Sequence, residues 1–345
     1  MLSSRAVLVS VAGLLASLGF YLFATEAPSP APNPALPLAD TPYVLHDDLS
    51  DYTDFMMSGG PPPDGIPAID DPQFVDADGA DLDDGDMIIG FVHNGEARAY
   101  PQNIMVHHEI VNDAVGRLNV AVTYCPLTAT AQGFKRGDTT LGVSGQLLNS
   151  NLVMFDRNTE SYFSQIAATG LTGDHASATL DEVNLIWTTW DPWRAQHPET
   201  QVLSDDTGHM RNYSNDPYGR YNPRGGYYNA REVIFPLMHE SDAHHPKDMV
   251  VGARTDEESV HFMLDTLEDE RVLRADGFIA VYDERFHTGH IYEADEMPDV
   301  TPTENNRYEI DGESYAPDAL PLDALVSIEA FFFAWNAFYP DSNTV

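Results

Sequence analysis

Short apolar runs separated by glycine, asparagine and proline are the clearest pattern along the chain. Residues 87–92 are apolar, residues 97–100 alternate, and the turn His93-Asn94-Gly95 lies between them. Two such runs around a turn of this kind predict a β-hairpin. Further β-rich runs follow at residues 118–125 and 139–165. The pattern therefore predicts a β-rich α+β fold.

Helical features are fewer. Residues 104–113 predict a short helix or an irregular piece, and residues 179–200 predict a helix that stops before Pro192 or Pro198. Thr179 and Glu182 fit a capping box for that helix. The aromatic stretch at the C-terminal end predicts a helix or strand that packs back on the core. The stretch from Ser58 to Phe74, rich in Gly and Pro, predicts a loop.

Two pairs of similar segments indicate an internal duplication. "DMIIG" at 86–90 is similar to "DMVVG" at 248–252, and "VAVTY" at 120–124 is similar to "IAVYD" at 279–283. Similar spacing within both halves predicts two β-rich lobes, at 43–205 and 206–345. Chance similarity between apolar strands is the alternative explanation.

The N-terminus has the features of a membrane anchor or an export signal. Arg5 precedes the uncharged segment Ala6–Ala24, whose 19 residues would form a helix of roughly 28 Å, near the thickness of a bilayer core. A positive flank before it and an acidic stretch after it place the bulk of the chain outside the cell. We expect residues 1–24 to be an uncleaved membrane anchor. A cleaved signal peptide, which would give a secreted protein, and a buried core helix are the alternatives.

A proline-rich segment follows the apolar one. Residues 25–42 contain six prolines in 18 residues, which predicts an extended tether between membrane and folded part. We expect the folded domain to run from about Tyr43 to the C-terminus.

The charge of the chain is extreme. It has 55 Asp and Glu against 17 Lys and Arg, a net charge of −38, and only two lysines, Lys135 and Lys247. In molar salt the Debye length falls to about 3 Å, so like charges repel little across a surface. Because the acidic residues are spread along the chain, adaptation to high salt is favoured over a calcium-loaded or polycation-binding protein. Nucleic acid is excluded as a partner, since no basic stripe offsets the negative field.

The acidic segment from Asp76 to Asp86 has only a partial likeness to a calcium loop. Ala80 occupies a position where an EF-hand needs a ligand, and no Glu closes the loop. We therefore expect a solvated acidic loop.

Cys125 is the single cysteine, so no internal disulfide can form. With His107 and His108 it could hold copper or zinc, which would support redox chemistry. With His108 as base and Glu109 nearby it could act as a nucleophile. The alternative is a small buried core residue in a non-catalytic surface or structural module. A free thiol in an oxidising compartment requires either burial or a function.

Two other regions carry weaker indications. The histidines of the second half form a loose group without a clear carboxylate set: His239, His244, His245, His287 and His290. The segment "DPYGRYNPRGGYYN" at 216–229 could contact a glycan or a protein partner, or form an ordinary surface loop.

Several motifs in order resemble one known family. They are "GGPPPDGIPAIDDPQF", "GEARAYP", "HHEIVND", "VAVTYCPLTATA", "NSNLVMFDRNTES" and "FFFAWNAFYP". From about Ser58 to Pro340 the chain resembles domain-of-unknown-function family 3179, found in exported bacterial and archaeal proteins. The resemblance implies no established reaction. Family members often read C-P-L-C, but Thr128 stands at the last position here, so a dithiol cycle within this motif is not available.

Overall fold

The computed structural model describes residues 35–294 and 296–344. These residues belong to one compact unit. The predicted anchor at 1–24 and most of the predicted tether lie outside the described residues. Within the described ranges, no helix combines the length and apolar character needed to cross a membrane.

The first half contains most of the strands. Its helices and 3-10 turns are α1 (Leu49–Phe55), η1 (Ala77–Gly79), α2 (Gln102–His108), η2 (Gly173–His175) and α3 (Trp190–Gln196). Its strands are β1 (Met57–Ser58), β2 (Phe74–Asp76), β3 (Met87–His93), β4 (Glu96–Pro101), β5 (Ile110–Val115), β6 (Leu118–Cys125), β7 (Thr130–Lys135), β8 (Leu141–Leu148), β9 (Asn151–Asp156), β10 (Tyr162–Ser164), β11 (Gly170–Thr172), β12 (Glu182–Val183), β13 (Ile186–Thr189) and β14 (Gln201–Leu203).

A long segment, residues 204–248, connects the halves and holds only the 3-10 turn η3 (Gly226–Asn229); we call it the linker. The second half has the helices α4 (Leu264–Glu270) and α5 (Phe332–Phe338). Its strands are β15 (Met249–Arg254), β16 (Ser259–Met263), β17 (Val272–Ala275), β18 (Phe278–Asp283), β19 (Thr288–Glu293), β20 (Thr301–Thr303), β21 (Arg307–Ile310), β22 (Glu313–Tyr315), β23 (Asp323–Ala324) and β24 (Ile328–Phe331).

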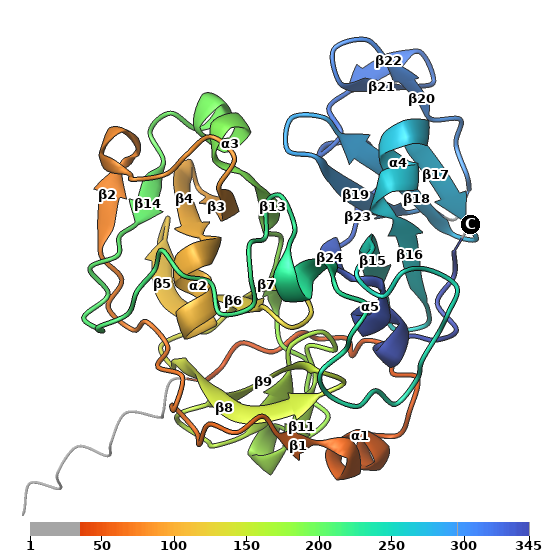
Figure 1. Cartoon of the computed structure of the whole chain (residues 1–345). Helices are drawn as coiled ribbons and strands as arrows, with labels where there is room; N and C mark the ends of the chain where they lie inside the picture. Colours follow the sequence, from red (N-terminus) through yellow and green to blue (C-terminus); the bar gives the residue numbers. More distant parts are fainter. Residues whose placement is uncertain (1–34, 295, 345) are drawn as a thin grey trace, which may run out of the picture. The chain divides into compact units, whose positions relative to one another are not determined.

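The predicted β-rich α+β class is confirmed, and the strands of the two halves form separate sheets (Figure 1). The hairpin of β3 and β4 lies in the sheet β13-β3-β4-β14-β2, and β5 to β7 form the sheet β12-β7-β6-β5. The second half has the sheets β16-β15-β24 and β17-β18-β19-β23.

The two halves repeat one order of elements. Hairpin, seven-residue helix and three-stranded meander follow one another as β3-β4-α2-β5-β6-β7 and again as β15-β16-α4-β17-β18-β19. Each repeat then adds a strand beside its meander, a strand beside its hairpin and a closing helix, as β12-β13-α3 and β23-β24-α5. The small sheets β8–β11 and β20–β22 are inserted at the same point of each repeat. We refer to the two units as the first and second repeat.

Side-chain packing repeats as well. A Cβ on Gly90 would lie 2.2 Å from the Trp193 ring, and a Cβ on Gly252 would lie 2.5 Å from the Trp335 ring. Each tryptophan thus lies against a hairpin strand that only glycine lets it approach. Each indole N–H donates to a hydroxyl seven residues later, at 3.1 Å in both repeats.

The repeats contact each other reciprocally. Strand β24 of the second repeat contacts β7 of the first, and β13 of the first contacts β19 of the second. The Phe331 N–H, at the end of β24, donates to the Thr128 carbonyl at 2.9 Å. Since β13 and β24 hold equivalent places, the interface has an approximate twofold character.

The prediction of one helix over residues 179–200 is wrong. The segment forms β12 and β13 before α3 begins at Trp190, and Pro192 lies in the first turn of that helix. Proline is tolerated there because the first N–H groups of a helix have no partner within it. The β-branched and aromatic residues of β13 pair with β3 instead. Glu182 pairs with Arg254 at 3.1 Å, so it forms no capping box.

The folded part of the described chain begins before Tyr43, the start that the sequence predicts. Leu36 is buried in the core, and Leu38 forms a β-bridge with Leu180. The Ala39 N–H donates to the Thr179 carbonyl at 2.8 Å. The last part of the predicted tether is therefore attached to the folded unit.

Candidate functional site

Cys125 ends β6 inside the first repeat. Its side chain is 1% exposed, and its thiol lies 3.8 Å from the Ser150 carbonyl oxygen. Burial, followed by the charge of Glu109, raises the pKa of the thiol to about 11. Because the thiolate is the nucleophile and the metal ligand, a thiol kept protonated at neutral pH is poorly suited to either role.

Polar residues around the loop that follows Cys125, which we call the cysteine loop, form a closed hydrogen-bond network. The Asn151 amide donates to Thr128 Oγ1 at 3.0 Å and to Gln165 Oε1 at 2.8 Å. The Gln165 amide in turn donates to Thr123 Oγ1 at 2.8 Å. A buried network whose members find partners makes a core rigid and specific. The segments around Cys125 are therefore held together by a rigid, buried hydrogen-bond network.

Glu109 is the one predicted partner that the structure brings to Cys125. It caps α2 in a left-handed conformation, with φ 59°, and its side chain is buried. Burial raises the pKa of this carboxyl to about 8, and its charge acts on both Cys125 and Tyr218. Arg271 holds the equivalent place after α4 of the second repeat. The acid is thus specific to the first repeat.

His108 uses both ring nitrogens elsewhere. Nδ1 lies 2.7 Å from the Pro67 carbonyl, which can only accept, so Nδ1 carries the proton. Nε2 lies 2.7 Å from the Tyr213 hydroxyl, which therefore donates to it. Burial lowers the pKa of His108 to about 4. The imidazole is neutral and fully hydrogen-bonded, which leaves no lone pair for a metal or a proton.

His107 points to the linker, where its Nε2 lies 3.0 Å from the Asn215 carbonyl. In the described ranges, neither His107 nor His108 forms a hydrogen bond with Cys125, and no trio of metal-ligating groups includes the cysteine. The predicted catalytic and metal roles of these residues stay predictions.

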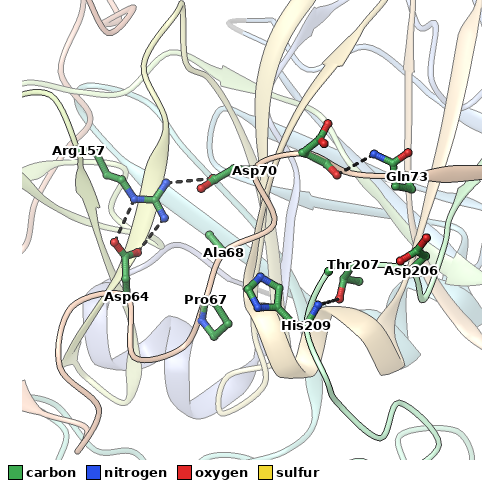
Figure 2. Close-up of a pocket in the computed structure, with 11 residues that line it drawn as sticks. Asp64, Pro67, Ala68, Asp70, Gln73, Arg157, Asp206, Thr207 and His209 are labelled. Carbon is green, nitrogen blue, oxygen red and sulfur yellow. Dashed lines mark hydrogen bonds and ion pairs between the residues drawn. The ribbon is translucent and has the colours of Figure 1, made fainter.

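Asp64, Asp70, Asp206 and His209 are among the residues that line an acidic hollow of about 780 Å³ (Figure 2). The His209 ring on its wall is 5.3 Å from the His108 ring, centroid to centroid. Arg157 crosses the hollow with ion pairs of 2.8 Å to Asp64 and 3.0 Å to Asp70. Its guanidinium is already neutralised by the carboxylates around it, and these carboxylates are exposed to solvent. Asp71, Asp206 and the His209 ring also line the hollow, so its remaining groups are mainly acidic.

A second cavity, of about 550 Å³, lies between the two repeats; we call it the inter-repeat cavity. It takes wall residues from β3, β13, the linker, β15, α4, β18 and β24. Its aromatic wall residues are Trp187, Tyr221, Tyr282 and Phe286. Its hydrogen-bonding and charged residues are Thr188, Thr189, Asn222, Arg224, Glu268, His287 and Glu329. Apolar walls with a few polar groups are the usual composition of a small-molecule site.

Glu329 is the buried ionisable group of this cavity. It projects from β24, is 7% exposed, and one carboxyl oxygen accepts a hydrogen bond from Thr288 at 2.6 Å. Burial raises its pKa to about 8, although Thr288 and Arg224 oppose the shift. At neutral pH the carboxyl is therefore mainly protonated and can donate a hydrogen bond. Arg224, exposed at the rim, is fixed by a 2.6 Å bond to the Lys247 carbonyl.

Equivalent positions of the two repeats meet in the inter-repeat cavity. Met87 and Met249, which begin β3 and β15, both line it. Trp187 and Glu329 also correspond, since each pairs with the third residue of its hairpin strand. The segments "DMIIG" and "DMVVG" thus start at the cavity. The similarity of these two segments is the feature of the sequence that marks this site, although by itself it indicates only a duplication.

The tyrosines of the linker pack inward. Tyr228 is buried, and its hydroxyl donates to Asp216 at 2.9 Å. The Tyr227 hydroxyl donates to the Leu127 carbonyl at 2.8 Å. The large hydrophobic side chains exposed on the described surface include no aromatic residue. An open aromatic patch for a glycan or protein, one expectation for this segment, is therefore absent from residues 35–294 and 296–344.

The buried Lys247 completes the packing of the linker. Its Nζ lies 3.1 Å from the centre of the Tyr227 ring and 4.9 Å from that of Phe333. Burial lowers the pKa of this amine to about 7. Aromatic faces attract a cation, so they stabilise the ammonium form that burial disfavours.

Comparison with known families matches residues 63–342 to the family described as "Protein of unknown function (DUF3179)". Searches of curated proteins and of solved structures found no match. The matched region covers both repeats, the cysteine loop and the inter-repeat cavity. The chain therefore belongs to the DUF3179 family of proteins of unknown function.

Proposed function

We propose that this protein is a tethered binding protein of the cell surface, which takes a small molecule into the inter-repeat cavity. The observation that carries the proposal is the composition of that cavity. Aromatic walls from both repeats enclose a protonated Glu329 and an Arg224 held at the rim. Ligand sites occur preferentially where two structural units meet.

The groups of the cavity favour an uncharged ring compound rich in hydroxyl oxygens, of the sugar class. Protonated Glu329 and Arg224 both donate hydrogen bonds, so the ligand must present acceptors. Trp187 and Tyr221, which pack edge to face with ring centres 5.1 Å apart, form part of the apolar wall against which a ring would lie. The net charge of −38 disfavours an anionic ligand at low salt.

A copper or zinc centre at Cys125 is the competing function. The thiol is protonated at neutral pH, and the lone pair of His108 is occupied by Tyr213. Both facts favour a structural cysteine. Binding in the inter-repeat cavity needs neither residue, and we therefore prefer it over redox or nucleophilic chemistry at Cys125.

The N-terminal segment and the acidic charge support the proposed location at the cell surface. The apolar segment 6–24 supports a membrane anchor or an export signal, and the acidic composition supports work at high salt. Both features suit a receptor that faces a saline medium.

A thermal-shift screen tests the proposal. The full chain without residues 1–24, in molar NaCl, is heated with neutral monosaccharides, with simple amines and with carboxylates at millimolar concentration. We expect at least one sugar to raise the Tm in a saturable way, because a ligand that binds only the folded state stabilises it. Arg224→Ala should weaken this response, and Arg211→Ala, an exposed arginine outside the cavity, should leave it unchanged.

Two results would contradict the proposal. One is a screen in which no sugar raises the Tm. The other is a sugar response that is the same in the wild type and in Arg224→Ala.

A further inference from the structure

Three metal-ligating side chains meet outside the cysteine loop and the inter-repeat cavity. His46 and Asp47 precede α1, and His239 lies in the linker. One ligand atom from each lies within 4.8 Å of the others. Among the described residues, this is the one trio of His, Cys, Asp or Glu side chains with such spacing. We call it the His46 cluster.

The hydrogen bonds of the cluster orient its ligands. His239 Nε2 lies 2.8 Å from an Asp47 carboxylate oxygen, so Nε2 carries a proton and donates it to the carboxylate. His46 Nδ1 lies 3.3 Å from the Asp341 carboxylate. A carboxylate on one ring nitrogen fixes the tautomer and leaves the other nitrogen free to bind a metal. The Asp341 side chain, which is 87% exposed, stands near the outer position of a metal-binding histidine but forms no hydrogen bond with His46 there.

The backbone on either side is anchored before any metal binds. The Val44 N–H donates to the Thr255 carbonyl at 2.8 Å. On the linker side, the Met238 N–H donates to Asn149 Oδ1 at 2.8 Å. The two segments are therefore fixed next to each other by contacts outside the cluster. A site that is organised in advance loses less entropy when it is occupied.

From this geometry we infer that the His46 cluster binds a divalent transition metal of the zinc type. Two imidazole nitrogens and one carboxylate oxygen form a set that zinc accepts, with one position left for water. Ligand atoms bound to zinc at about 2.0–2.2 Å lie roughly 3–4 Å apart, so a closure of about 1 Å suffices. The metal takes the place of the N–H that His239 donates to Asp47, and that proton moves to Nδ1 of the same ring, so the imidazole stays neutral.

A metal bound here would cross-link two segments of the chain, and this structural role is separate from the proposed sugar site. The cluster connects two segments of the chain. One is the lead-in segment before α1, which carries His46 and Asp47, and the other is the linker, which carries His239. Asp341 adds the C-terminal end of the chain. A metal here would hold the linker in place over the first repeat and would strengthen the attachment of the lead-in segment.

Zinc titration of the full chain without residues 1–24 tests the inference, with affinity measured by competition against a chromophoric chelator. We expect one saturable zinc per chain and a higher Tm with zinc than with chelator. Asp47→Asn and His239→Gln should abolish the saturable site. His244→Gln is the matched control, because His244 lies in the same linker and outside the cluster.

Asp341→Asn separates a metal site from a general acidic surface. Loss of an outer carboxylate typically weakens metal binding about 10–100-fold, and because Asp341 is largely exposed we expect the lower end of that range, about 10-fold. Cobalt(II) offers a second readout, because its visible spectrum reports the geometry of nitrogen and oxygen ligands in each variant that folds. The inference is overturned if zinc does not saturate at one per chain, if Asp47→Asn binds it as the wild type does, or if calcium displaces it at equal concentration.

Discussion

At the scale of single residues, burial decides which ionisable groups can act. The pKa of Cys125 is raised to about 11 and that of His108 is lowered to about 4, so both are neutral at pH 7. The carboxyls of Glu109 and Glu329 are raised to about 8 and are mainly protonated. Of these four groups, Glu329 lines the inter-repeat cavity. The sequence motifs point to Cys125, whereas the lining of this cavity points to Glu329.

The first prediction concerns the reactivity of Cys125. Because the thiol is buried and protonated, iodoacetamide should label it only after unfolding. Mass spectrometry after a timed exposure in native buffer and in guanidinium measures this directly. The unfolded chain is the positive control, since Cys125 is the single cysteine. Complete labelling of the native protein within minutes would show an accessible thiol and would restore the catalytic interpretation.

The second prediction concerns Glu329 and pH. A carboxyl whose pKa is raised on folding stabilises the native state fully below its unfolded pKa, near 4.5, and loses this effect as pH rises to about 8. Glu329→Gln, which mimics the protonated form, lacks the dependence. The wild type should therefore lose stability relative to Glu329→Gln over this window, by up to about 1.4 kcal/mol per pH unit.

Urea unfolding of both proteins between pH 5 and pH 8.5 measures that difference, and the comparison cancels the titration of other groups. Parallel stability curves would mean that Glu329 is ionised in the native state. The cavity would then lack the hydrogen-bond donor on which the sugar proposal depends.

At the scale of elements, each repeat depends on a close approach between a glycine and a tryptophan. Helix α3 presents Trp193 to Gly90, and α5 presents Trp335 to Gly252. Both contacts fix a closing helix on a hairpin strand. Since β13 and β24 lead into these helices and also line the cavity, the packing positions Trp187 and Glu329.

Gly90→Ala and Gly252→Ala should both destabilise the protein, by about 1–3 kcal/mol, because the added methyl group overpacks a filled core. Gly225→Ala is the control, since no atom lies within 4 Å of the position that its added methyl group would take and its φ is −150°. Chemical denaturation gives the three values. Equal stability of Gly90→Ala and Gly225→Ala would show that α3 does not pack as described.

Elements were predicted correctly where the pattern that defines them lies within one short stretch of sequence. The hairpin at 87–100 was predicted because its alternation and its turn lie within one short stretch. Residues 179–200 were mistaken for one helix because β13 is defined by its pairing with β3, far away in the chain. The same reason hid the inter-repeat cavity. Met87, Trp187, Met249 and Glu329 come from equivalent strands of the two repeats, and although a shared motif relates the two methionines, no local pattern relates Trp187 to Glu329.

At the scale of the whole molecule, charge sets the conditions of stability. A net charge of −38 on one folded unit produces repulsion that salt screens. We expect the Tm to rise by several degrees or more between 0.1 M and 2 M NaCl. Millimolar calcium should not replace molar NaCl. If it does, the acidic residues form calcium sites, and adaptation to high salt is the wrong interpretation.

The repeated order of elements also indicates where function is expected in the whole molecule. The repeats differ most where the first carries Glu109 and Cys125 and the second carries Arg271 and Asp283. Glu109, Cys125 and Asp283 are buried in their own repeat, and Arg271 is half-buried. The groups that face a shared space come instead from equivalent strands of both repeats, which is why the account places ligand binding between them.

The most direct test compares Cys125→Ala with Glu329→Ala in the sugar thermal-shift assay, under the conditions used for the wild type. The account predicts that Cys125→Ala has a lower Tm and keeps the sugar-induced rise, whereas Glu329→Ala folds and loses that rise. A response that is lost in Cys125→Ala and kept in Glu329→Ala would contradict the account, and would move the functional site to the cysteine.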